Sequence, residues 1–172
     1  TPRTAGFNTV DQGALSESGS LLTMLLMFVG GSPDSTAGGI KTTTLVVLIV
    51  GAISSSKGET DLSIFKRRLE DNVLKRASSI TFIYAAAALV STLIMCAAEP
   101  YSIKEVLFDV LSAEGTVGLT TGITPKLGSL SKLILTFLMY GGKVGGLTLA
   151  IVLAERKEVV PTQRPAEKII IG

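Results

Sequence analysis

The chain repeats one short pattern at an interval of about 112 residues. Residues 4–9 read TAGFNT, residues 116–121 read TVGLTT, and each copy leads into a long apolar segment. The same frame also aligns Leu15/Leu127, Leu21/Leu133, Leu26/Leu138, Met27/Met139 and Gly30/Gly142. A duplicated Thr-x-Gly pattern followed by an apolar helix indicates a symmetric membrane pore rather than a globular enzyme.

The glycine of Thr-x-Gly is the residue through which this pattern can form a cation-binding site. Glycine reaches backbone conformations that side chains exclude, so successive carbonyls can turn toward one axis. Carbonyl oxygens arranged in this way replace the hydration shell of a bare cation. The hydroxyls of the neighbouring threonines can add to them.

Composition supports a membrane protein and removes several kinds of site. Hydrophobic residues make up 47% of the chain and charged residues 17%, whereas soluble domains carry about 25% charged residues. The chain has no histidine, which excludes histidine metal ligands and general bases. Cys96 is the single cysteine and is expected to be a buried thiol. A net charge of +2 is too small to indicate nucleic-acid binding.

The clearest membrane span is residues 79–98, an almost uninterrupted apolar run that ends at Glu99-Pro100. About 20 such residues cross a hydrocarbon core roughly 30 Å thick. The segment 103–112 is too short to span and is amphipathic, with Lys104, Glu105 and Asp109 on its polar face. It is expected to enter the membrane and turn back, directing its C-terminal carbonyls at residues 116–119. A surface helix is the alternative.

Two further apolar segments, 15–53 and 127–153, contain helix breakers. Residues 30–39 read GGSPDSTAGG and residues 141–146 read GGKVGG. Irregular backbone at membrane depth is tolerated where protein shields it or where it lines a water-filled cavity. Both interruptions therefore predict a gate or second constriction below each Thr-x-Gly segment.

Basic residues predict the orientation. They gather in the segment 57–76 and in the C-terminal tail, which the positive-inside rule assigns to the cytoplasm, with the Thr-x-Gly segments toward the outside. Segment 57–76 has a partly helical apolar pattern and is either a solvated connector or a docking surface. The chain starts inside the first motif, so we expect it to be the C-terminal part of a longer protein.

Three motifs carry a family resemblance: TAGFNT at 4–9, GGSPDSTAGGIKTTT at 30–44 and GTVGLTTG at 115–122. In order and spacing the chain resembles the Trk/Ktr/HKT superfamily of potassium transporters, in particular the bacterial Ktr-type membrane subunit. The resemblance implies an all-α membrane protein of four repeats, each a spanning helix, pore helix, filter and second, broken spanning helix. Residues 1–56 would end the third repeat, 57–76 form a cytosolic linker, and 77–172 form the fourth repeat with a cytosolic tail.

The resemblance also implies roles for individual residues. Two of four K⁺ filter segments would be Thr4, Ala5, Gly6 and Phe7, and Thr116, Val117, Gly118 and Leu119, with Phe7 and Leu119 packing behind the filter. The gate would contain Gly30, Gly31, Ser32, Asp34, Ser35, Thr36, Gly38 and Gly39, with Lys143 as the pore-facing cation where family members commonly have arginine. Expected partners are the lipid bilayer, a cytosolic nucleotide-binding regulatory subunit and a second copy of the full-length protein in a homodimer, without nucleic acid. No cofactor is expected, and coupling of K⁺ to Na⁺ or H⁺ is left open.

Three ionisable residues stand out within the apolar segments. Lys143 would cost about 2.5–3.5 kcal/mol to insert, which favours a function or a partner. Asp34 could attract a cation or pair with Lys143 or Lys41. Glu114, just before the second filter segment, could supply negative field or accept hydrogen bonds from filter amides.

Two rival functions fit parts of the pattern. A secondary transporter of small solutes also uses broken helices around a midplane site, but it does not account for Thr-x-Gly after a short helix. A nucleotide-binding enzyme is suggested by GGIKTT at 38–43, yet a Walker loop needs glycine directly before lysine, and Ile40 intervenes.

Overall fold

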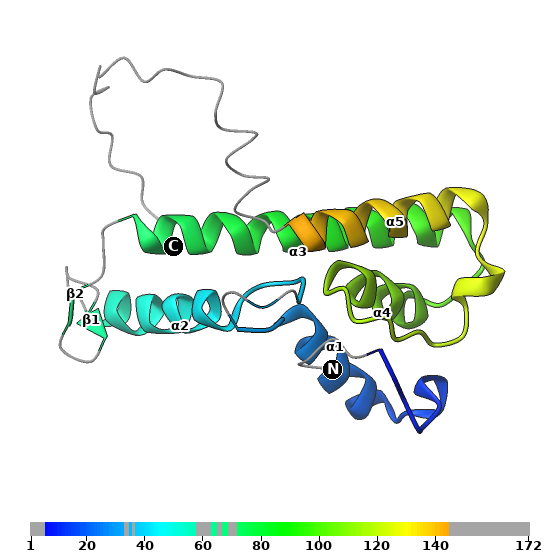
Figure 1. Ribbon diagram of the computed structural model, residues 1–172, viewed down its shortest axis with the longest axis horizontal. Coiled ribbons are helices and arrows are strands. Elements are labelled where there is room, and N and C mark those ends of the chain that lie inside the picture. The colour runs from blue at the N-terminus through cyan, green and yellow to red at the C-terminus, as the bar shows by residue number, and fades with distance from the viewer. Residues whose placement is uncertain are drawn as a thin grey trace, which may run out of the picture.

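The computed structural model describes residues 6–32, 35, 37–57, 63–64, 67–68 and 72–144. The described part is mostly helical (Figure 1). Its helices and strands in chain order are η1 Gln12–Ala14, α1 Glu17–Phe28, α2 Thr42–Ser56, β1 Ser63–Ile64, β2 Arg67–Arg68, α3 Val73–Ala98, α4 Ile103–Glu114, η2 Thr124–Lys126 and α5 Ser129–Val144. Thr1–Ala5 and residues 145–172 lie outside the description.

Helix α3 is the longest described helix, and α2, α4 and α5 pack against it. It has 26 residues, so at 1.5 Å per residue it is roughly 39 Å long. Among the described helices it alone is long and apolar enough to cross a membrane. Figure 1 shows α2 beside its first half and α5 beside its second half. The predicted span 79–98 is therefore confirmed as a helix, and it ends at Ala98, before Pro100.

Helix α4 lies in the centre of the packing, against α1, α3 and α5. It starts with a capping box in which the Glu105 N–H donates to the Ser102 hydroxyl and the Ser102 N–H donates to the Glu105 carboxylate. Such a cap fixes the first turn by satisfying free backbone donors. Val106 and Phe108 are fully buried, and so is nearly every residue that follows them to Glu114. The short helix predicted at 103–112 is thus present, and its surroundings are not those of a surface helix.

The duplication is visible in the local structure. η1 and η2 lie 112 residues apart, and α1 and α5 begin with the same offset. The two copies then differ. α1 ends at Phe28 and the chain resumes as α2 at Thr42, as the breakers at 30–39 predict. Helix α5, in contrast, continues to Val144.

The interruption predicted at 141–146 is therefore wrong for Gly141 to Val144, and residues 145–146 lie outside the description. A helical glycine costs only about 1 kcal/mol relative to alanine, so tertiary packing can override it. Gly142 is buried and lies directly against the main-chain carbonyl of Glu114, where no side chain would fit. This glycine permits a close approach between helices instead of ending one.

The helical pattern predicted for 57–76 is also wrong over its described middle. Ser63–Ile64 and Arg67–Arg68 pair as two short antiparallel strands. The helix starts only at Val73, where α3 gains packing partners. A few apolar residues spread over a short segment do not hold a helix without such partners.

Candidate functional site

The two Thr-x-Gly segments, distant in sequence, meet in space. Gly6 and Gly118 both have positive φ, 71° and 85°, a conformation that favours glycine. A methyl group built on Gly6 would lie 2.9 Å from the Val117 carbonyl oxygen, and one on Gly118 would lie 3.7 Å from the Gly6 Cα atom. The main chains therefore touch at the glycines. Thr4 and Ala5, which were predicted to belong to the first segment, lie outside the described residues.

The second segment has an unusual backbone path that α4 holds in place. Thr116 has a φ of 53°, which is rare for a β-branched residue and typical of strained functional sites. The Thr116 N–H donates to the Ala113 carbonyl at 3.0 Å, and the Val117 N–H donates to the Ser112 carbonyl at 2.8 Å. The end of α4 thus uses the amide donors of the segment and fixes its direction.

Asp109 anchors the chain immediately after this segment. Its carboxylate is 3% exposed and accepts the Thr121 N–H at 3.1 Å and the Thr120 hydroxyl at 2.9 Å. The hydroxyl of Thr124 donates to the same carboxylate. The prediction that Asp109 lies on a polar face is wrong, because helix periodicity does not show that a later loop folds back over this residue. The run of threonines at 120, 121 and 124 was the available signal.

The Gly-rich loop between α1 and α2 is tied to the second segment. The Gly38 N–H donates to the Thr116 hydroxyl oxygen at 2.8 Å. At the base of the loop, the Gly30 N–H donates to the Ile40 carbonyl at 2.8 Å, and a parallel bridge joins Val29 to Ile40. The loop is therefore a closed structure whose inner end contacts the Thr-x-Gly segment.

The residues predicted to form a gate fall into three groups. Gly30, Gly31, Gly38 and Gly39 are buried, Ser32 and Ser35 are exposed, and Asp34 and Thr36 lie outside the described residues. The hypothesis that Asp34 pairs with Lys41 or Lys143 thus stays a prediction. The Lys41 ammonium donates to the carbonyls of Ala37 at 2.6 Å and Ser35 at 3.0 Å, which closes the loop on itself.

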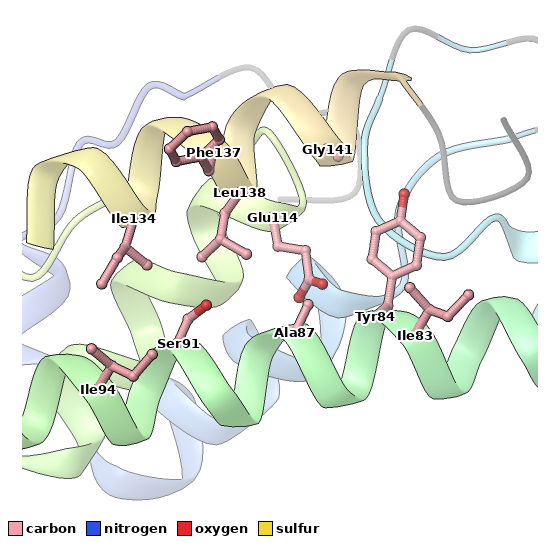
Figure 2. Close-up of a pocket in the computed structure, with 11 residues that line it drawn as sticks. Ile83, Tyr84, Ala87, Ser91, Ile94, Glu114, Ile134, Phe137, Leu138 and Gly141 are labelled. Carbon is pink, nitrogen blue, oxygen red and sulfur yellow. The ribbon is translucent and has the colours of Figure 1, made fainter. Parts of the chain in front are cut away.

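Lys143 shares a cavity with the second Thr-x-Gly segment. The cavity has a volume of about 470 Å³, and Thr116, Gly118 and Lys143 contribute to its wall. The Lys143 side chain is exposed, on the face of α5 that also presents Met139 and Tyr140 to this space. The opposite face of α5 lines a different cavity, shared with α3 (Figure 2).

Other single-residue predictions have mixed outcomes. Leu119 is buried as expected, whereas Phe7 is 92% exposed and packs behind nothing in the described chain. Cys96 is half-buried and carries a free thiol at the edge of the core. Glu114 Oε2 has no hydrogen-bond partner among the described residues, so of the two alternatives for Glu114 the one in which it accepts hydrogen bonds from main-chain amides is not seen at this atom.

Comparison with known proteins gives the family. The model of the TrkH family, described as cation transport protein, matches residues 1–160. The chain is 38% identical to the potassium/sodium uptake protein NtpJ of Enterococcus hirae, over 100% of this chain and 40% of that protein. It is 34% identical to the Ktr system potassium uptake protein B of Bacillus subtilis, over 92% of this chain and 36% of that protein. It belongs to the TrkH family of cation transport proteins.

Membership confirms the resemblance read from the three motifs. The family consists of ion transporters rather than enzymes, so the phosphate-loop alternative is set aside. The long apolar helix α3 agrees with a membrane protein. This TrkH-family chain spans about two fifths of the length of the curated relatives it matches.

Proposed function

We propose that the protein takes up K⁺ across the cell membrane, and that residues 4–7 and 116–119 select the ion through their main-chain oxygens. The meeting of Gly6 and Gly118 at positive φ carries this proposal. Two glycines that let two carbonyl-bearing segments converge are what a shared coordination site for a dehydrated cation requires. The names of the relatives, which describe potassium or sodium uptake, agree with it.

The loop 30–39 is proposed as the gate, with Lys143 as a positive barrier below the filter. The bond from Gly38 to Thr116 supports this role because it couples loop position to a filter residue. Thr116, Gly118 and Lys143 line one cavity, which supports a role in which the Lys143 charge repels a cation on the proposed ion path. Lysine keeps the charge of the more common arginine but lacks its planar fork of donors.

The larger assembly is also part of the proposal. Residues 1–56 and 77–172 would contribute to two of four repeats, joined by the cytosolic linker 57–76, with a cytosolic C-terminus. A cytosolic nucleotide-binding subunit and a second membrane subunit would complete the transporter. Support comes from the duplication and from relatives named as parts of a Ktr system.

The test is uptake by the full-length protein in liposomes. Rb⁺ or K⁺ uptake is expected, and Gly118→Ser should lower the preference for K⁺ over Na⁺ roughly tenfold, since a side chain in the left-handed region costs about 1–2 kcal/mol. Gly122→Ser is the matched control, because Gly122 also has positive φ, 97°, but lies outside the segment with open space around it. Uptake of an organic solute alone, or equal selectivity in the two variants, contradicts the proposal.

A further inference from the structure

A cavity of about 320 Å³ lies between α3 and α5, on the face of α5 turned away from Lys143 (Figure 2). This volume is at the small end of the range for sites of small molecules, about 300–1,000 Å³. Its wall is largely apolar, with Ile94 from α3 and Ile134 and Phe137 from α5. Phe137 is 69% exposed, so in the described chain the cavity is open to its surroundings where this side chain lies.

One carboxylate projects into this apolar space. Glu114, the last residue of α4, is 3% exposed, and its Oε2 atom has no hydrogen-bond partner among the described residues. Figure 2 shows the carboxylate between the helices, beside Ala87 of α3. Burying a carboxyl group without a partner is costly, whether it is ionised or carries its proton. An orphaned oxygen of this kind indicates a ligand that supplies the missing partner.

The surroundings narrow the chemistry of that ligand. Alkali cations need several oxygen ligands, and the remaining polar side chains at this wall are the hydroxyls of Ser91 and Tyr84. The apolar side chains suit a hydrocarbon body, and the carboxyl suits one nitrogen. We propose that the cavity binds a hydrophobic primary amine, with the nitrogen on Glu114 and the hydrocarbon against Ile94, Ile134 and Phe137. A hydrogen bond joins the nitrogen to the Glu114 carboxyl group both as an ammonium beside a carboxylate and as an amine beside a carboxylic acid.

The position of Glu114 connects this cavity to the transport machinery. Its main-chain carbonyl lies against Gly142 of α5 and within 2.7 Å of a methyl group built on Gly38 of the loop. Two residues further on, Thr116 lines the cavity on the other side. A ligand held by Glu114 is thus bound next to the place where α4, α5 and the loop meet, on the side of α5 that faces α3. The binding site itself does not depend on which ion the protein selects.

Photolabelling of the full-length protein tests the proposal without measuring transport. The probes are an octylamine and an octanol that carry the same photoreactive diazirine, compared at equal concentration and neutral pH. The amine is expected to label peptides covering 83–94 and 134–142 several-fold more than the alcohol does. Glu114→Gln, which keeps the size of the side chain, should abolish this preference. Ala87→Phe, which keeps the carboxylate but fills the cavity, should abolish labelling by both probes.

Three outcomes overturn the proposal. Equal labelling of the parent protein by amine and alcohol shows that the carboxyl does not recognise nitrogen. A preference for the amine that survives in Glu114→Gln assigns recognition to another group. Absence of labelling in these peptides shows that the cavity binds neither probe. A folded Glu114→Gln protein, verified by its thermal unfolding, is required for the comparison, and Ala87→Phe provides the independent second variant.

Discussion

The two copies of the Thr-x-Gly unit begin alike and are supported differently. Each has a glycine at positive φ, a short 3-10 helix and then an apolar helix at the same offset. The equivalent glycines Gly30 and Gly142 both lie directly against a carbonyl, but Gly30 meets Gly38 of its own loop and Gly142 meets Glu114 of α4. Glycine at equivalent positions thus permits a break in the helix of one copy and a close crossing of two helices in the other.

The anchors of the two copies also differ. The second copy is held by the buried Asp109 carboxylate, which lies on a separate helix. In the corresponding part of the first copy, residues 8–13, the described side-chain bonds are local and exposed: the Asn8 amide donates to the Val10 carbonyl, and Asp11 accepts the Gly13 N–H. A bond that is buried and charged contributes more than an exposed local one. The buried Asp109 carboxylate therefore fixes the path of the chain that follows the second Thr-x-Gly segment.

The largest expected effect comes from placing a methyl group on Gly30 or Gly142, the equivalent glycines of the two copies. Gly30→Ala and Gly142→Ala should each destabilise the full-length protein by about 3 kcal/mol or more, because a backbone carbonyl cannot move aside. Thermal unfolding in detergent measures this. Gly51→Ala is the control, since the three atoms nearest to its methyl group belong to the Leu74 side chain, which can change rotamer. If Gly142→Ala unfolds at the same temperature as Gly51→Ala, the close contact of α4 and α5 is refuted.

Removing the anchor of the second copy should change selectivity. Asp109→Ala leaves three threonines without their acceptor, and hydrogen bonds to a charged group contribute about 1.5–3 kcal/mol each. We expect the preference for K⁺ over Na⁺ to fall at least about tenfold, with a smaller loss in Asp109→Asn, which keeps one acceptor oxygen. Asp11→Ala in the first copy should leave the permeability ratio unchanged. Unaltered selectivity in Asp109→Ala contradicts a positioning role for this carboxylate.

A smaller effect should follow when the loop is detached from the second copy. Thr116→Val keeps the branched shape but removes the acceptor of the Gly38 N–H, a loss of about 1 kcal/mol. Hydrogen exchange at the Gly38 amide should become about fivefold faster. Thr116→Ser retains the hydroxyl and is expected to exchange like the parent protein. Identical exchange in all three proteins would remove the proposed coupling between gate and filter.

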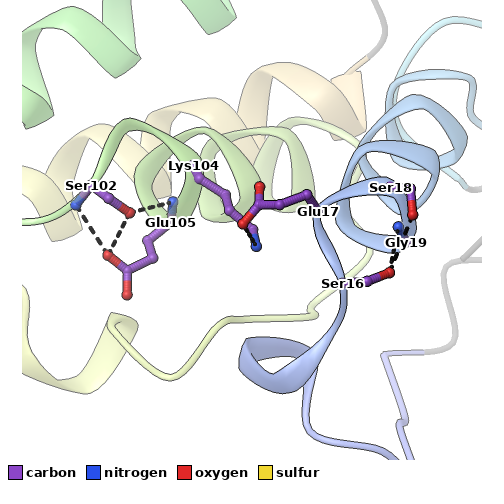
Figure 3. Close-up of polar contacts among 7 residues, drawn as sticks. All are labelled: Ser16, Glu17, Ser18, Gly19, Ser102, Lys104 and Glu105. Carbon is purple, nitrogen blue, oxygen red and sulfur yellow. Dashed lines mark hydrogen bonds and ion pairs between the residues drawn. The ribbon is translucent and has the colours of Figure 1, made fainter.

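The smallest effect concerns the outer contact between the copies. The Lys104 ammonium of α4 and the Glu17 carboxylate of α1 are 3.0 Å apart, and Glu17 is 89% exposed (Figure 3). Exposed ion pairs contribute about 0.2–1 kcal/mol and are screened by salt. A double-mutant cycle with Glu17→Gln and Lys104→Met should give a coupling in this range at low salt. A coupling of several kcal/mol would show that the pair is shielded in the complete protein.

Sequence patterns predicted the elements that depend on local chemistry. Apolar length identified α3, the breakers at 30–39 identified the gap between α1 and α2, and the repeat identified Gly6 and Gly118 as special positions. The break predicted at Gly141–Gly142 is wrong, because glycine in a helix is a weak signal that packing overrides. The exposed position predicted for Asp109 is also wrong, because sequence alone does not show which later segment covers a polar residue on a helix face.

Local sequence patterns were enough to predict one long apolar helix, two copies of a glycine-centred motif and a resemblance to potassium transporters. The contact between the two motifs, the anchoring of one of them by Asp109 and the position of Glu114 at an apolar cavity depend on how the helices pack. The two groups of features differ in the range of the interactions that determine them. Hydropathy and backbone freedom act within a few residues, whereas the partner of a buried carboxylate is chosen by segments that meet only after the helices have packed.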